Sequence, residues 1–218
     1  MRVRFQEFAS RRFAFHKDPV LVLEEFWSPK DMAYFQEAMN RSQWKALADM
    51  PEVSQAFPNC GNWIKAEMAP QEGAAFLERL ALDCIHEYIE SFPNIKQRHM
   101  NFSYYSYAAG DCLSTHNDTE EGYSPDRRAQ PALRRVALVT YMHSEWSQDW
   151  GGELILYETR KNRQGELVCD VSQCIAPQPG SLVLFTVPRY HRVCRVDPLA
   201  GSHKRLSIAG WFMTEHET

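Results

Sequence analysis

The sequence predicts an α+β protein in which supporting helices precede an antiparallel β-sandwich or jelly-roll barrel. Two observations lead to this class. The patterning changes from helical to strand-like near residue 100, and about seven short apolar segments then follow at even spacing. Helices placed ahead of the strands are expected to cover one face of a sheet. We expect one domain over residues 1–218, with helical support and first strands over about 1–99 and the barrel over 100–214.

The first half of the chain predicts one strand and two helices. Residues 19–26, "PVLVLEEF", form a short apolar strand. A helix is expected to begin after Ser28, which is a favourable N-cap, with Pro29 in the first helical position and Asp31 in the first turn. Residues 76–92 predict a single amphipathic helix. Its apolar stripe is Leu77, Leu80, Ala81, Cys84, Ile85, Tyr88 and Ile89.

The second half alternates apolar segments with turn residues. Strands are expected over residues 102–109, 134–143, 152–159, 166–174, 181–187, 190–196 and 204–213. The turns between them contain a Gly-Gly pair at Gly151 and Gly152, "KNRQGE" and "APQPGS". This regular succession of strands and turns is typical of antiparallel barrels and sandwiches.

Composition restricts the class of partner. The net charge is -4 and the pI is near 6.1, so we expect no nucleic-acid partner, and the basic stretch "PDRRAQPALRR" is interpreted as a solvated loop. No run approaches ~18 apolar residues, and the charged N-terminal stretch lacks a signal-like apolar segment, so we expect no membrane partner. The six cysteines include no CxxC pair and are interpreted as small core residues of a cytoplasmic protein.

A metal site is indicated by "LSTHNDTEEG", where His116 and Asp118 lie two residues apart. On an extended strand running through "HND", both side chains would point to the same face. His191 follows a later apolar strand and would supply a third ligand. Two histidines and one carboxylate are the donor set of the facial triad that binds non-haem Fe(II).

Arg205 opens the last predicted strand and indicates an anionic ligand. A guanidinium inside a strand is costly to bury without a partner, and its fork matches a carboxylate. Ser207 lies on the same face and would donate a further hydrogen bond. An edge-strand ion pair at the surface is the alternative.

Residues 102–213 resemble the 2-oxoglutarate- and Fe(II)-dependent oxygenases of the prolyl-4-hydroxylase-like group, closest to the branch that contains ribosomal-protein prolyl hydroxylases. The segments that resemble this group are "YAAGDCLSTHND", "WGGELILY", "PGSLVLF" and "RLSIAGWF", which occur in the family's order. The resemblance implies a double-stranded β-helix fold. It also implies Fe(II), 2-oxoglutarate and O2 as cofactors, with ascorbate as an optional reductant.

Residue roles follow from the same resemblance. It implies His116, Asp118 and His191 as iron ligands and Arg205 as the residue that holds the distal carboxylate of 2-oxoglutarate. The remaining implied residues are Tyr107 and Tyr141 at the cosubstrate, and Trp211, which shares the face of Arg205 and packs beside the metal. The interval from His191 to Arg205 is longer than in some relatives, and "DPLAGSHK" within it is interpreted as a loop.

The predicted reaction couples oxidative decarboxylation of 2-oxoglutarate to hydroxylation of a C–H bond, with a prolyl residue of a protein or peptide as the substrate. A hydroxylase of a free or carrier-bound amino acid is the alternative. Two further hypotheses are a cupin-like metalloprotein that does not use 2-oxoglutarate and a non-enzymatic β-sandwich module. Candidate substrate contacts are Tyr123, Arg127, Arg128, Trp146 and Trp150, and the polar insertion over residues 119–133 is expected to read the substrate. The oligomeric state is left open.

Overall fold

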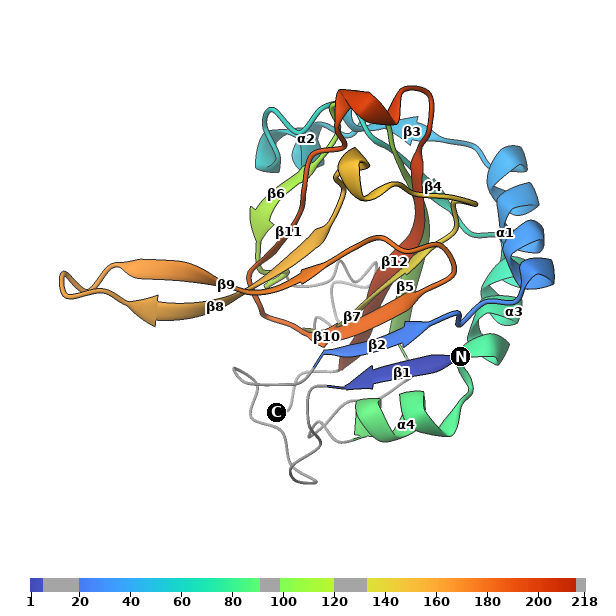
Figure 1. Cartoon of the computed structure of the whole chain (residues 1–218), viewed down its shortest axis with the longest axis horizontal. Helices are drawn as coiled ribbons and strands as arrows, with labels where there is room; N and C mark the ends of the chain where they lie inside the picture. The colour runs from blue at the N-terminus through green and yellow to red at the C-terminus, as the bar shows by residue number, and fades with distance from the viewer. Residues whose placement is uncertain (6–19, 91–98, 120–132, 215–218) are drawn as a thin grey trace, which may run out of the picture.

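Two antiparallel sheets face each other in the computed structural model, which describes residues 1–5, 20–90, 99–119 and 133–214 (Figure 1). The strand order is β1-β2-β10-β7-β12-β5-β4-β3 in the larger sheet and β6-β11-β8-β9 in the smaller one. Three helices of the first half, over residues 29–41, 70–80 and 83–90, contribute to the core that covers the larger sheet. The predicted α+β class, with a jelly-roll core and N-terminal helices, is confirmed.

The elements follow one another closely. The strands are β1 (Arg2–Phe5), β2 (Leu21–Glu24), β3 (Lys45–Ala46), β4 (Ile64–Glu67), β5 (His99–Tyr107), β6 (Leu113–His116), β7 (Leu133–Tyr141), β8 (Leu154–Lys161), β9 (Leu167–Ile175), β10 (Leu182–Thr186), β11 (His191–Val193) and β12 (Arg205–Thr214). The helices are α1 (Pro29–Arg41), α2 (Pro51–Ala56), α3 (Pro70–Leu80) and α4 (Asp83–Glu90), with short 3₁₀ turns at Leu47–Asp49, Gln148–Trp150 and Pro198–Ala200.

Strand β7 shows why the apolar runs of the second half became central strands. Val136 and Leu138 pack into the core between the larger sheet and the helices. Ala137 and Val139 point the other way and pack between the two sheets. Because both faces are covered, the strand reads as a nearly continuous apolar run rather than an alternating one.

The start of α1 agrees with the sequence prediction. The Ser28 hydroxyl accepts a hydrogen bond from the Asp31 amide at 3.2 Å, and the Asp31 carboxylate accepts one from the Ser28 amide at 3.3 Å. This reciprocal capping box satisfies two backbone donors that have no partner within the helix. Phe35 and Met39 then face the core.

The prediction of one helix over residues 76–92 is wrong. Helix α3 ends at Leu80 and α4 begins at Asp83, with Ala81 in a non-helical conformation between them. The break allows Phe76 on α3 and Ile85 on α4 to enter the same core cluster. Neither Ala81 nor Leu82 is a helix breaker, so tertiary packing overrides local propensity here.

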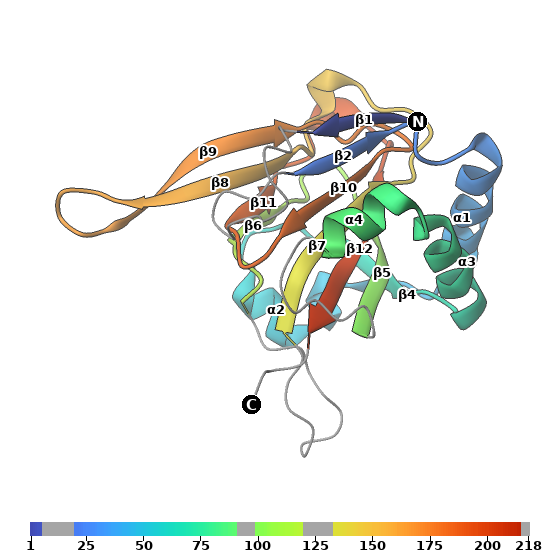
Figure 2. The same ribbon diagram turned by 90° about the horizontal axis from the view of Figure 1, so that it is seen from below.

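The β8–β9 hairpin projects from the body of the molecule, and among the described strands it joins its sheet through β8, which pairs with β11 (Figures 1 and 2). Its strands pair in antiparallel register from Leu154 opposite Ile175 to Lys161 opposite Leu167, and an ion pair joins Arg160 to Asp170 across the strands. Within the described part of the chain, none of the helices has the length and apolar character needed to cross a bilayer.

Gly210 of β12 lies opposite Phe102 of β5, with no space for a side chain. A Cβ atom at this position would lie 1.7 Å from the Asn101 carbonyl oxygen, so the strands must separate to admit any side chain. Gly210→Ala is expected to lower the free energy of unfolding by about 3 kcal/mol, in the range of overpacked cores. Urea unfolding of the purified variant measures this change.

Gly73 provides the matched control. It lies within α3, and a Cβ there would meet nothing within 4 Å. Gly73→Ala is expected to raise the free energy of unfolding by about 0.5–1 kcal/mol, because alanine restricts the unfolded chain and favours helix. Equal effects of the two substitutions would show that the close approach at Gly210 has no energetic importance.

Candidate metal centre and cosubstrate pocket

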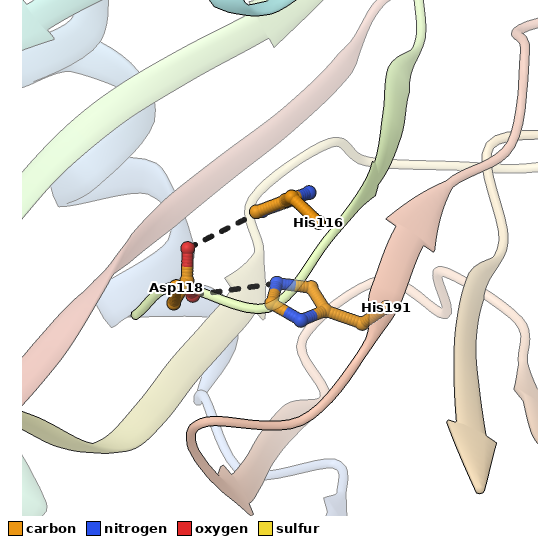
Figure 3. Close-up of side chains that lie close together, drawn as sticks. All are labelled: His116, Asp118 and His191. Carbon is orange, nitrogen blue, oxygen red and sulfur yellow. Dashed lines mark ion pairs between the residues drawn. The ribbon is translucent and has the colours of Figure 1, made fainter. Parts of the chain in front are cut away.

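Three potential metal ligands meet between the sheets (Figure 3). His116 ends β6, and His191 begins β11 directly opposite it in the antiparallel pairing. The Nε2 atom of His116 lies 3.3 Å from Oδ1 of Asp118, and the Nε2 atom of His191 lies 3.4 Å from its Oδ2. The ligand atoms all lie within 4.8 Å of one another, so the structure brings together the predicted triad.

The local geometry that delivers Asp118 differs from the prediction. Strand β6 ends at His116, and Asp118 has a φ of 58°, in the left-handed region. Side-chain alternation along a strand therefore does not explain why the two residues converge. A turn directs the Asp118 carboxylate back toward the imidazoles, and Asp is among the few residues that tolerate this conformation. Trp211 on β12 donates its Nε1–H to Oδ2 of Asp118 at 2.7 Å and holds the carboxylate in place.

Both imidazoles are oriented by backbone carbonyls. Nδ1 of His116 lies 2.8 Å from the Ser114 oxygen, and Nδ1 of His191 lies 2.7 Å from the Arg189 oxygen. A carbonyl only accepts hydrogen bonds, so each Nδ1 carries the proton and each Nε2 presents its lone pair to the centre.

The charge states suit a divalent cation. Burial lowers the pKa of His191 to about 4, with a further contribution from His116, so its imidazole is neutral at pH 7. Burial raises the pKa of Asp118, but its polar surroundings, which include the His116 and His191 rings and the hydrogen bond donated by Trp211, lower it overall. Neutral nitrogen and anionic oxygen donors on one side of the site fit Fe(II) and leave its other positions open.

Arg205 forms the second functional centre of the pocket and is only 1% exposed. Its Nε donates to the Gly152 oxygen at 2.7 Å, and its Nη1 lies 3.5 Å from the Ser207 hydroxyl. Among the described residues, Nη2 of Arg205 and the buried hydroxyl of Tyr141 have no hydrogen-bond partner. A carboxylate beside them would satisfy both donors, so this end of the pocket fits the distal carboxylate of 2-oxoglutarate.

Gly152 makes room for this arginine. It has a φ of 74°, and a Cβ atom there would lie 2.9 Å from Cδ of Arg205. The sequence predicts the Gly-Gly pair only as a turn. The second glycine of the pair also gives Arg205 its space at the cosubstrate end of the pocket. A Gly-Gly pair next to a strand does not indicate this role in the sequence alone.

The remaining predicted residues divide into three groups. Tyr107, Ser207 and Trp211 line the pocket, which has a volume of about 380 Å³. Trp146 and Trp150 do not line it: Trp146 packs beside His143 and Gly152, behind Arg205, and Trp150 stacks on His203. The structure therefore gives no support to substrate contacts by these two tryptophans. The last group, Tyr123, Arg127 and Arg128, lies outside the described residues, as does most of the 119–133 insertion.

Sequence reasoning missed the pocket wall that the first half of the chain supplies. Phe57 packs edge-on against the His116 ring, with a centroid distance of 5.1 Å. Trp63 stacks on Tyr107, and Lys65 lies near Tyr105. These residues follow no periodic pattern in a region interpreted only as helical support, so no sequence signal identifies them.

His143 is buried behind the pocket, and we expect its titration to lower the stability of the protein in acid. Burial and the charge of Arg205 lower its pKa to about 4. In the unfolded chain the imidazole has its ordinary pKa of about 6.5. Between pH 6.5 and pH 4 it therefore binds a proton in the unfolded state but not in the folded state, and acid favours unfolding. When the pH falls from 7 to 5, the free energy of unfolding decreases in both proteins. The decrease is expected to be about 2 kcal/mol smaller in His143→Asn than in the wild-type protein.

Urea unfolding of the metal-free protein at the two pH values measures this difference. Exposed His203 is the control, and His203→Asn should keep the wild-type pH dependence. His191 contributes in the same direction in the metal-free protein, so part of the dependence remains in His143→Asn. An undiminished dependence in that variant would contradict the assignment.

Comparisons with known proteins agree with this geometry. Prolyl 3-hydroxylase OGFOD1 of Xenopus laevis is 30% identical over 140 residues, which cover 62% of this chain and 24% of the relative. The Mus musculus protein of the same name is 33% identical over 108 residues, which cover 49% of this chain and 17% of that relative. The chain thus spans about a quarter or less of these relatives.

A solved structure shows the same fold. The collagen prolyl hydroxylase of Paramecium Bursaria Chlorella virus-1, in complex with 2-oxoglutarate, superposes with a TM-score of 0.58 at 14% identity, covering 93% of this chain and 99% of that one. The sequence profile of the 2OG-Fe(II) oxygenase superfamily matches residues 102–213, just over half of the chain. This span contains the triad and Arg205, and the chain therefore belongs to the 2OG-Fe(II) oxygenase superfamily.

Proposed function

We propose that the protein hydroxylates a prolyl residue of a peptide or protein and couples this reaction to the oxidative decarboxylation of 2-oxoglutarate. One observation carries the proposal: a His-Asp-His triad and a buried arginine with an unpaired nitrogen among the described residues share one pocket. The prolyl substrate is supported by the names of the relatives, which are prolyl hydroxylases. A free or carrier-bound amino acid is the alternative substrate.

Functions without 2-oxoglutarate chemistry fit the protein less well. A cupin-like metalloprotein that does not use 2-oxoglutarate does not account for the superfamily match or for Arg205. Triad side chains lying far apart would have favoured a non-enzymatic sandwich module, and they lie together.

Each residue has a distinct proposed task. His116, Asp118 and His191 would hold Fe(II), which when bound supplies dioxygen activation and the oxidising power for C–H cleavage. Trp211 would keep the Asp118 carboxylate oriented toward the metal.

The cosubstrate contacts come from the other end of the pocket. Arg205, Tyr141 and Ser207 would bind the distal carboxylate of 2-oxoglutarate, with Tyr107 beside the guanidinium at 5.5 Å from its ring centroid. Burial keeps the pKa values of both tyrosines above their usual range, so both stay neutral and Tyr141 remains a hydrogen-bond donor. The apolar walls between the sheets exclude water from the reacting atoms.

The test supplies purified protein with Fe(II), 2-oxoglutarate, O2 and ascorbate, and measures succinate. Proline-containing peptides are then screened for increased succinate and for addition of one oxygen atom. Fragmentation of the product distinguishes carbon 3 from carbon 4 of the proline ring. His191→Ala is the matched control. Succinate release at the level of this variant, with and without peptides, would refute the proposal.

We also propose that residues 1–218 act as one catalytic domain in the cytoplasm. Among the described residues the six cysteines are free thiols, which is typical of a reducing compartment. Cell fractionation with an antibody against the protein tests the location.

A further inference from the structure

The pocket contains more positive charge than the proposed cosubstrate neutralises. Of the described residues that line it, Lys65, Arg134 and Arg205 are cationic, and Asp118 is the single carboxylate. This excess is local, because the whole chain has a net charge of -4. A cleft with low-dielectric walls concentrates such a field on whatever enters it.

Lys65 brings one of these charges to the pocket from β4. It lies beside Tyr105, and its Nζ is 5.8 Å from the centroid of that ring. No carboxylate of the described residues lies within 4 Å of it, although Glu67 is near enough to act on its charge. Burial lowers the pKa of Lys65, and Glu67 opposes this effect. Lys65 and Arg134 both line the pocket.

Arg134 reaches the pocket because of a bulge. Strand β7 pairs regularly with β12 up to Val136 opposite Phe212, and the register then shifts so that Arg134 lies opposite Met213. Regular alternation from Ala137 would have turned Arg135 inward instead. The guanidinium carbon of Arg134 lies 3.8 Å from the centroid of the Trp211 ring.

The charges remain unbalanced when the site is filled. Fe(II) carries two positive charges and 2-oxoglutarate two negative ones, so together they leave the balance of the protein side chains unchanged. Nη1 of Arg134 lies 3.8 Å from Oδ1 of Asp118, but with the cation bound that carboxylate would be a metal ligand. Asp118 and one cosubstrate carboxylate would then neutralise Fe(II), and the other cosubstrate carboxylate would neutralise Arg205. A positive region around Lys65 and Arg134 is left for the substrate.

We propose that the substrate presents a carboxylate close to the carbon that is hydroxylated, and that Lys65 and Arg134 bind it. This inference rests on the proposed function and identifies the class of substrate. The carboxylate has two natural sources: an Asp or Glu side chain next to the proline in a peptide, or the α-carboxylate of a small or C-terminal substrate. An ammonium and a guanidinium fork bind either group through charge-assisted hydrogen bonds.

Binding to the anaerobic complex with Fe(II) and 2-oxoglutarate tests the proposal without turnover. Calorimetry compares capped peptides that contain Glu-Pro or Pro-Glu with their Gln counterparts, and compares free proline with prolinamide. The wild-type protein is expected to bind at least one carboxylate probe about tenfold or more tightly than its neutral counterpart. Tighter binding of the Glu peptides than of the Gln peptides would identify a side-chain carboxylate. Tighter binding of proline than of prolinamide would identify an α-carboxylate.

Variants assign the preference to the pocket. Lys65→Met should reduce the preference for the carboxylate probe over its neutral counterpart to about threefold or less. Lys65→Arg should retain most of the preference, because it keeps the positive charge. Lys161→Met removes an exposed cation from the end of β8 and should leave the preference intact. The wild-type preference should also weaken as salt is added.

Two results would overturn the inference. One is equal binding of every charged and neutral pair, including no detectable binding of any probe at millimolar concentration. The other is a carboxylate preference that survives Lys65→Met unchanged. Succinate release by the wild-type protein without peptide reports separately on the proposed function, so failure of the one is distinguishable from failure of the other.

Discussion

Replacing Arg205 with methionine is expected to weaken the binding of 2-oxoglutarate by at least about a hundredfold. The buried guanidinium has a nitrogen without a partner among the described residues, and a carboxylate would accept two charge-assisted hydrogen bonds from the fork, each contributing about 1.5–3 kcal/mol. Methionine fills a similar volume without charge, so the fold should survive. Calorimetry of 2-oxoglutarate binding to the anaerobic Fe(II) protein measures the effect.

Two further variants complete this experiment. Arg160→Met removes an exposed arginine from the β8–β9 hairpin and should leave 2-oxoglutarate binding unchanged. Arg205→Lys should recover only part of the loss, because an ammonium does not reproduce the planar fork. Wild-type affinity in Arg205→Met would mean that another residue holds the distal carboxylate.

Replacing Asp118 with asparagine is expected to reduce Fe(II) affinity by more than about a hundredfold. Asparagine tolerates the left-handed conformation at a φ of 58°, so the substitution removes the negative charge while preserving the backbone. Even changes to groups that only orient metal ligands reduce affinity by about 10–100-fold, and loss of a direct anionic ligand should exceed this. Anaerobic titration with Fe(II), followed by calorimetry, measures the change.

Asp170→Asn is the control for the loss of one carboxylate. Asp170 is exposed on β9, in the projecting hairpin, and is not part of the triad, so Fe(II) affinity should match that of the wild-type protein. If Asp118→Asn bound Fe(II) as tightly as the control, the cation would have to be held by the histidines and other groups.

The central strands and the His116–Asp118 pair were predictable because their signals are local. A run such as "RRVALVTYMH" is apolar on both faces and fits a strand between two layers. His116, Asp118 and His191 were predicted to meet, and they do. A turn at Asp118, and not strand alternation, aims its carboxylate at the two imidazoles.

The remaining features depend on contacts that no short segment encodes. The break between α3 and α4 falls at residues that favour helix, and only the shared core explains it. The inward position of Arg134 follows from a bulge against β12. Lys65 comes from a four-residue strand, too short for a periodic pattern to be recognised.

The hydrogen bonds from the two Nδ1 atoms to backbone carbonyls have a consequence for the kinetics of metal capture. They fix the rings of His116 and His191 in the metal-free protein, so the rotamer entropy of both side chains is lost during folding. An arriving cation meets donors that are already in place, and little of the chain has to become ordered around it. The association rate should then depend on access through the pocket and on displacement of the cation's own hydration shell.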